Sequence, residues 1–222
     1  MRTAKSTGRM VGVLLLLQLA GLTGPFVLLF PLMAGPQAAL ANAAGASLQI
    51  KLAVVLLLVN CALTIGITIA SFAIFRQLSE AMALWLLAAS VILFVAQAVD
   101  NVHIMSMLSL SQQYVQAGGG DLFQTLAEVV GSTRKWAHFT ELLVIDCWIF
   151  LFYAVLYRFA LVPRALAIFG LITVLFHFTG IPLLGFLGYG VVMPMGASMA
   201  VSHVALGLWL VIRGFDARVM TT

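Results

Sequence analysis

Four side chains near the middle of the sequence have the types and spacing that a metal site or a proton relay needs. Asp100 and His103 stand three residues apart, and His138 and Glu141 repeat that spacing in the reverse order. Residues three apart share one face of a helix. Each pair therefore presents a carboxylate and an imidazole on one side, and two such helices face to face would gather all four groups.

The chemistry of these four groups allows three interpretations. Two nitrogen and two carboxylate ligands suit zinc, iron or manganese, and Glu-x-x-His pairs hold metals in di-metal helical bundles. The same groups would also serve as a proton relay or a substrate site. In a purely structural interpretation, each acid pairs with a neighbouring histidine, or with Arg134 or Lys135.

The order of the residues predicts how the two pairs meet. In antiparallel helices, His103 and His138 would share one layer, with Asp100 and Glu141 about 4.5 Å deeper, at ~1.5 Å rise per residue. All four residues lie near the predicted outer ends of their helices. The sequence therefore predicts a site that opens toward the outer face.

A second polar set comprises Asp146, His177 and His203, each well inside an apolar run. Two histidines at one depth would be able to ligate a haem, in a pocket made by small residues: Gly170, Gly180, Gly196 and Gly207. The alternative is that each histidine makes an interhelical hydrogen bond. Asp146 has no basic residue at its depth, so we expect it to be protonated or paired with one of these histidines.

The elements that carry these residues are predicted to be membrane-spanning helices. The 222 residues are 63% hydrophobic and 8% charged, whereas soluble domains carry roughly 25% charged residues. Six apolar runs approach the ~20 residues that a span requires: 10–33, 51–75, 83–108, 136–157, 165–187 and 191–212. The expected fold class is all-α, a polytopic six-helix membrane bundle forming one domain over residues 1–222.

Basic residues predict the orientation of the spans. With the N-terminus inside, eight of the eleven fall on the cytoplasmic side and three outside. The inner set is Arg2, Lys5, Arg9, Arg76, Arg158, Arg164, Arg213 and Arg218, and the outer set is Lys51, Arg134 and Lys135. We expect a multi-pass protein of the cell (inner) membrane with both termini in the cytoplasm.

Three segments have further predictions attached. Pro25 predicts a kink or break in the first span, and the basic start followed by small residues near Ala41 also resembles a signal peptide. Residues 34–50 are predicted to be an outer loop or interfacial helix. Residues 109–135 are predicted to hold a short surface helix capped by Asp121, with a lid over the site as the alternative.

Two stretches carry a family resemblance: LYRFALVPRALAIFGLI at 156–172 and VALGLWLVIRGFD at 204–216. They resemble an uncharacterised bacterial membrane family, the domain-of-unknown-function 4386 family. The N-terminal RMVGVLLLLQLAGLTGPFVL fits it less specifically. The resemblance implies a multi-span membrane protein and carries no catalytic residues or agreed activity with it.

Several function classes are excluded or left open by these patterns. The basic residues form no patch for nucleic acid, and two separate cysteines, Cys61 and Cys147, exclude a disulfide framework and are expected to be packing residues. A metal-dependent enzyme, a proton-coupled transporter or permease subunit, and a non-catalytic scaffold stay open. The expected partners are the lipid bilayer and a small hydrophobic or periplasmic ligand, in an unknown oligomeric state.

Overall fold

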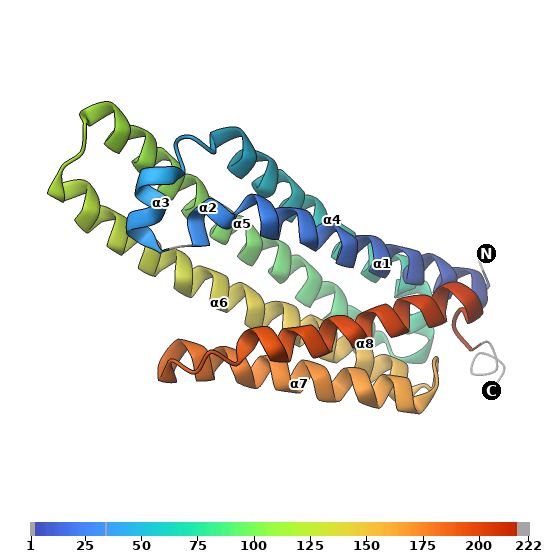
Figure 1. The fold of residues 1–222 in the computed structure, drawn as a ribbon. Helices are drawn as coiled ribbons and strands as arrows, with labels where there is room; N and C mark the ends of the chain where they lie inside the picture. The colour runs from blue at the N-terminus through green and yellow to red at the C-terminus, as the bar shows by residue number, and fades with distance from the viewer. Residues whose placement is uncertain (1–2, 34, 217–222) are drawn as a thin grey trace. The chain divides into compact units, whose positions relative to one another are not determined.

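Long apolar runs with few breakers fold into long helices in the computed structural model, which describes residues 3–33 and 35–216. Six helices are long and apolar enough to cross a membrane. They are α1 (Ala4–Leu28), α4 (Ser47–Leu78), α5 (Glu80–Ala117), α6 (Asp121–Arg158), α7 (Arg164–Leu187) and α8 (Val192–Arg213) (Figure 1). Within the described residues there is no strand. The prediction of an all-α fold with six membrane-spanning helices is confirmed.

Two short helices, α2 (Phe30–Met33) and α3 (Pro36–Asn42), fill the stretch between α1 and α4. α1 contains Pro25 and ends three residues later, at Leu28. A proline inside a helix removes one backbone hydrogen bond and crowds the preceding turn, which weakens the helix near this point. The predicted break is therefore present. α3 occupies part of the segment expected to be a loop or interfacial helix, and its Ala39 and Leu40 are buried.

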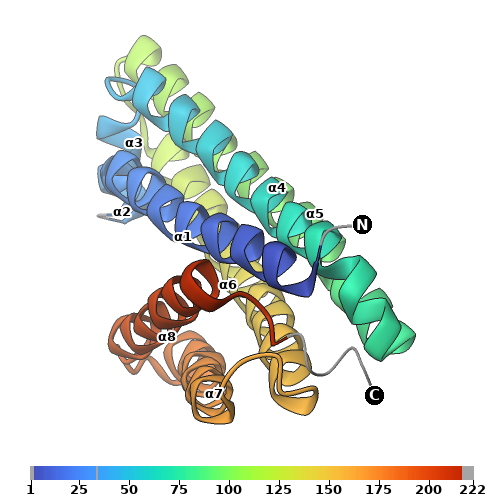
Figure 2. The same ribbon diagram turned by 90° about the vertical axis from the view of Figure 1, so that its right-hand side faces the viewer.

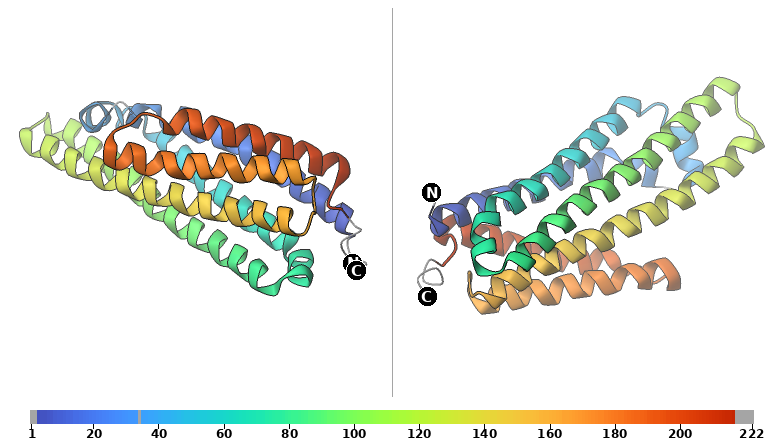
Figure 3. Two further views of the ribbon diagram at one scale, coloured as in Figure 1. Left: turned by 90° about the horizontal axis from the view of Figure 1, so that it is seen from below. Right: turned by 180° about the vertical axis from the view of Figure 1, so that it is seen from behind.

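The prediction of a separate surface helix within 109–135 is wrong. α5 continues to Ala117 and α6 starts at Asp121, so this segment belongs to two long helices joined only by Gly118–Gly120 (Figure 3). It holds no proline, and its one other glycine, Gly131, is tolerated inside α6. The three linking glycines have φ of 73°, 103° and 137°, a region that other residues rarely adopt. The alternative that this segment covers the site stays a prediction.

α5 and α6 are unusually long for membrane spans. Each has 38 residues, or about 57 Å at ~1.5 Å per residue, against a hydrocarbon core of ~30 Å. Polar residues concentrate around the glycine turn, in SQQYVQ before it and in the first half of α6 after it. Both helices therefore have a polar part next to an apolar part that is long enough to span.

The chain is divided into two compact units, and α1, α4, α5 and α6 contribute to both. The first comprises residues 1–19, 62–93 and 142–222, and the second comprises residues 20–61 and 94–141. The expectation that residues 1–222 form one membrane domain stays a prediction.

The first unit is held together by close helix packing. α7 and α8 run side by side in opposite directions (Figure 2), and α1 approaches α8 so closely that a Cβ at Gly12 would lie 2.7 Å from the backbone nitrogen of Val211. In this core the rings of Trp148 and Phe152 are stacked, 5.3 Å apart. The Trp148 indole donates to the hydroxyl of Thr68 at 3.0 Å.

The second unit has its own apolar core, which includes Leu40, Ile50, Ile104 and Ala127. Ser111 of α5 fixes the end of α3 through two hydrogen bonds. Its hydroxyl donates to the Leu40 carbonyl at 2.7 Å and accepts the Ala44 amide at 2.8 Å. α3 is thereby attached to the α5–α6 hairpin.

Candidate functional site

A cluster of charged side chains lies between α5 and α6 in the second unit. α6 supplies Arg134, His138 and Glu141, which are spaced four and three residues apart and therefore share one helix face. α5 supplies Asp100 opposite them. Four polar groups of two signs thus meet inside a pair of helices that are apolar enough to span a membrane.

His138 is the centre of this cluster. Its Nδ1 lies 3.4 Å from Oε2 of Glu141 and 3.7 Å from Oδ2 of Asp100. Nε of Arg134 lies 3.9 Å from the other oxygen of Asp100. Contacts of this length are ion pairs rather than closed hydrogen bonds, which usually measure 2.7–3.2 Å.

The two carboxylates are buried, whereas the ring of His138 is partly exposed. The side chains of Asp100 and Glu141 are 3% and 8% exposed, Arg134 is 20% exposed and the His138 ring is 45% exposed. Even so, the Nδ1 atom of His138 is buried and has no hydrogen-bond partner within the described residues, as is true of Nε of Arg134 and Oδ1 of Asp100. A buried polar atom that lacks a hydrogen bond costs about 1–3 kcal/mol. These atoms are therefore able to accept a hydrogen bond from another polar group or donate one to it.

Asp100 and Glu141 lie close together as predicted, since their carboxylates are 3.7 and 3.4 Å from the same nitrogen of His138. The prediction that His103 lies beside His138 stays a prediction. His138 faces Asp100, whereas His103 is half-buried and makes no hydrogen bond or ion pair with any described residue. The prediction followed from the order of the residues in two antiparallel helices, which does not specify how far each helix extends, and both helices continue to the glycine turn. Asp100 precedes Gly119 by 19 residues and His138 follows it by 19. Counting outward from the glycine triplet would have given the observed pairing.

The structural interpretation had placed Arg134 or Lys135 beside the acids, and the structure distinguishes the two. Arg134 pairs with Asp100, whereas the Lys135 ammonium lies over the rings of Trp136 and Phe139, 5.7 and 5.6 Å from their centroids. One residue along a helix turns a side chain by ~100°, so neighbours point to different faces.

A metal site at this position stays a prediction. Asp100, His138 and Glu141 do come together, but the described residues contain no group of three or more His, Cys, Asp or Glu side chains arranged to hold a metal ion. His103, the fourth proposed ligand, is not among the contacts.

The second polar set lies in the first unit, and the histidines there have different partners. Nδ1 of His177 is 2.9 Å from both carboxylate oxygens of Asp146, which confirms the expectation that Asp146 pairs with a histidine. Nδ1 of His203 is 3.0 Å from the Met199 carbonyl. The ring of His203 stands edge-to-face with Tyr153 at 5.4 Å.

A network of hydroxyl groups that was not predicted from the sequence lies beside these histidines. The Thr173 hydroxyl donates to the Ser202 oxygen at 2.9 Å, and the Tyr153 hydroxyl donates to it at 3.4 Å. Hydroxyls are common in spans, and only tertiary packing selects the ones that meet.

The glycines expected to open a haem pocket have neighbours instead. A Cβ at Gly170 would collide with the Tyr153 ring, one at Gly180 would lie 2.7 Å from Sδ of Met195, and one at Gly207 would lie 2.7 Å from a methyl carbon of Leu16. These three glycines admit neighbouring side chains rather than a cofactor. A Cβ at the fourth glycine, Gly196, would lie 3.3 Å from a ring carbon of His177. Haem ligation by His177 and His203 stays a prediction.

Other buried polar groups link the helices of the second unit. The Gln97 amide donates to Asn101 at 3.1 Å, and Asn101 donates to the Val54 carbonyl of α4 at 3.3 Å. The Cys61 thiol is 4.0 Å from the Gln97 carbonyl oxygen. Both cysteines are free, and Cys147 is exposed.

Comparison with known protein families finds a match over most of the chain. Residues 10–214 match a domain of unknown function, DUF4386. The chain belongs to the DUF4386 family. The match covers all six long helices, apart from the first turns of α1. No curated protein and no solved structure matches the chain.

Proposed function

We propose that this DUF4386 protein is a proton-coupled membrane carrier, in which the Asp100–His138–Glu141–Arg134 cluster binds the proton. The observation that carries the proposal is the position of His138 Nδ1, which faces two carboxylates from two helices without closing a hydrogen bond to either. Histidine is the side chain that gains and loses a proton near neutral pH. Ionisable groups inside membrane spans commonly form proton relays in transporters.

The formal charges of the cluster suggest the solute. With both carboxylates ionised, Arg134 balances one of them, so the cluster carries one negative charge when His138 is neutral and none when it is protonated. A negative site inside a membrane attracts a cation, and protonation of His138 would remove that attraction. The proposed activity is therefore exchange of a proton for a small cation.

The buried atoms of the cluster that lack hydrogen-bond partners support the same function. Oδ1 of Asp100 and Nδ1 of His138 are buried without hydrogen-bond partners among the described residues, and a solute or a water molecule would satisfy them. Capacity of this kind at a charged site is typical of groups whose partners change during a reaction cycle. Exchange across the bilayer also requires access from both sides, which we propose to alternate.

A vesicle experiment tests the proposal. The purified full-length chain is placed in phosphatidylcholine vesicles that are acidic inside, and an acridine dye reports the pH gradient. We expect addition of Na⁺, K⁺ or tetramethylammonium to dissipate the gradient. The variants His138→Gln and Glu141→Gln should slow dissipation about tenfold or more, a change of roughly 1.4 kcal/mol in the transport barrier.

The matched control is Thr140→Ala, because Thr140 is exposed and its hydroxyl bonds only the Trp136 carbonyl of its own helix. This variant should exchange as the parent protein does. Failure of all three cations to dissipate the gradient would overturn the carrier proposal. A stoichiometric metal in the purified protein that is lost in His138→Gln would favour the metal-dependent enzyme instead.

A further inference from the structure

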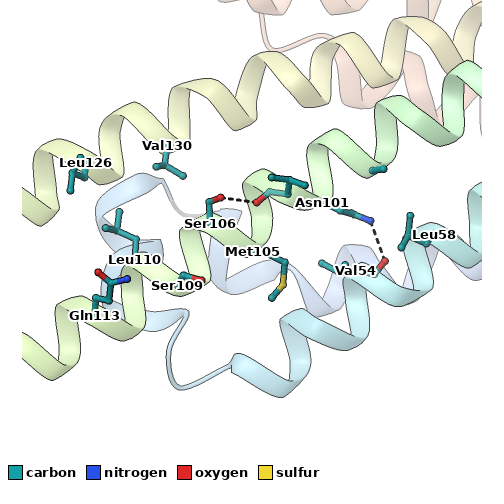
Figure 4. Close-up of a pocket in the computed structure, with 12 residues that line it drawn as sticks. Val54, Leu58, Asn101, Met105, Ser106, Ser109, Leu110, Gln113, Leu126 and Val130 are labelled. Atoms are coloured by element: carbon teal, nitrogen blue, oxygen red, sulfur yellow. Dashed lines mark hydrogen bonds between the residues drawn. The ribbon is translucent and has the colours of Figure 1, made fainter.

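A groove of about 680 Å³ follows α5 in the second unit, with walls from α4 and α6 (Figure 4). This volume lies within the roughly 300–1,000 Å³ typical of small-molecule sites. From Ala98 to Gln113 its floor on α5 extends about 22 Å, at ~1.5 Å per residue. The groove is therefore long and narrow rather than round.

The lining changes character along its length. One end is apolar, with Val54 and Leu58 of α4 beside Ala98 of α5. The other end carries Ser106, Ser109 and Gln113, which recur every three or four residues and so form a row on one face of α5 (Figure 4). An apolar end that leads into a polar end matches an amphiphile, which has an apolar chain and a polar headgroup.

The polar row has unused hydrogen-bonding capacity. The Ser106 hydroxyl bonds the Val102 carbonyl of its own helix at 2.8 Å. Within the described part of the chain, the side chains of Ser109 and Gln113 make no hydrogen bond. Asn101 is different, because its amide is engaged with Val54 and Gln97. Ser109 and Gln113 are thus available to a ligand.

The absence of charged residues in the groove restricts which lipid headgroup fits it. None of its lining residues is charged, whereas sites for phosphate-bearing headgroups are typically basic. Serine and glutamine side chains both donate and accept hydrogen bonds, which suits hydroxyl and ester groups. An uncharged headgroup is therefore the better complement.

We propose that this groove binds a neutral, diacylglycerol-like lipid, with its acyl chain along Val54, Leu58 and Ala98 and its hydroxyl and ester groups on Ser109 and Gln113. The helices that form it are long and apolar enough to cross a membrane, so such a lipid reaches the groove directly from the bilayer. This site is separate in its chemistry from the charged cluster, and it does not depend on proton exchange.

Photolabelling of the full-length chain in phosphatidylcholine vesicles tests the proposal. The probe is a diacylglycerol with a diazirine in one acyl chain, and the comparison is a phosphatidylglycerol with the same chain. We expect the diacylglycerol probe to label residues 54–58 and 98–113 at least about fivefold more than the charged lipid, because the charged headgroup would lose hydrogen bonds in an uncharged site.

Two variants with matched positions complete the experiment. Ser109→Phe fills the polar end and should remove most of the labelling, whereas Val99→Phe, at an exposed position of α5 outside the groove, should not change it. Both substitutions are exposed, so the unfolding temperature in detergent should stay the same. Equal labelling by the two lipids, or equal labelling of Ser109→Phe and Val99→Phe, would overturn the proposal and indicate only the ordinary lipid shell.

Discussion

The carboxylate of Asp146 holds the ring of His177 through both of its oxygens, each 2.9 Å from Nδ1. Both side chains are buried, one on α6 and the other on α7. With Nδ1 protonated, the ring donates to the carboxylate and Nε2 becomes the acceptor. An ionised Asp146 favours the tautomer of His177 that carries its proton on Nδ1, and the pair joins α6 and α7 inside the first unit.

Removing either partner of this pair should be costly. Asp146→Leu and His177→Leu should each lower the free energy of unfolding by about 3–5 kcal/mol, because the remaining buried group loses its partner. The double variant Asp146→Leu/His177→Leu should lose less than the sum of the single changes. Thermal unfolding in detergent measures all three, and additive losses would contradict the coupling. Thr179→Ala is the control, since its hydroxyl bonds only the Leu175 carbonyl of its own helix.

The contact between α1 and α8 should not tolerate a side chain at Gly12. A Cβ there would lie 2.7 Å from the nitrogen of Val211 and 2.8 Å from the carbonyl oxygen of Gly207, so Gly12→Ala forces the helices apart. We expect a loss of about 1–3 kcal/mol, the usual effect of overpacking. Gly66→Ala is the control, because nothing lies within 4 Å of its Cβ position and alanine favours a helix. Similar unfolding temperatures for the two variants would argue against the close contact.

Ser111 should be needed to fix α3. Ser111→Ala removes the partners of the Leu40 carbonyl and the Ala44 amide, at about 1–3 kcal/mol for each buried group left unpaired. We also expect faster hydrogen exchange at the Ala44 amide, which reports this contact directly. Ser106→Ala should change neither quantity, since Ser106 is exposed and bonds within its own helix. Unchanged exchange at Ala44 in Ser111→Ala would contradict the assignment.

His138 of the charged cluster and the nearby His103 should respond differently to substitution. His138 faces both carboxylates, whereas His103 makes no hydrogen bond or ion pair with a described residue. His138→Gln should therefore abolish cation exchange, and His103→Gln should leave at least about half of the rate, within roughly 0.5 kcal/mol. Metal analysis of the same proteins tests the four-ligand hypothesis, which requires equal loss of metal from both variants.

The orientation in the membrane follows from the basic residues and is directly measurable. Eight basic residues on one side against three on the other predict both termini in the cytoplasm. Reporter fusions after Arg76 and after Arg213 should both report cytoplasm, and a tag inserted at Gly119 should be accessible from outside. A fusion after either arginine that reports the periplasm would contradict this topology.

The sequence by itself determined the fold class, the six long apolar helices and, to within one residue, the limits of α7 and α8. Apolar runs separated by proline, glycine and single basic residues predict six spans. A helix satisfies its backbone hydrogen bonds within its own segment, and an apolar composition favours transfer of that segment into lipid, so both requirements are local. The break close to Pro25 and the start of α7 directly after Pro163 follow from the same local rules. The pairing of Asp146 with a histidine was also predictable, since a buried carboxylate in a span needs a partner.

Only the tertiary structure decided which polar residues meet. Which residue lies opposite His138 depends on where the two helices end, and residues 109–135 extend both of them to the glycine turn. The register between two helices is set by the turn that joins them and by the side chains packed between them, neither of which a single helix specifies. For the same reason, the contacts of Arg134 with Asp100, and of Ser202 with Thr173, became visible only once the helices were placed against each other.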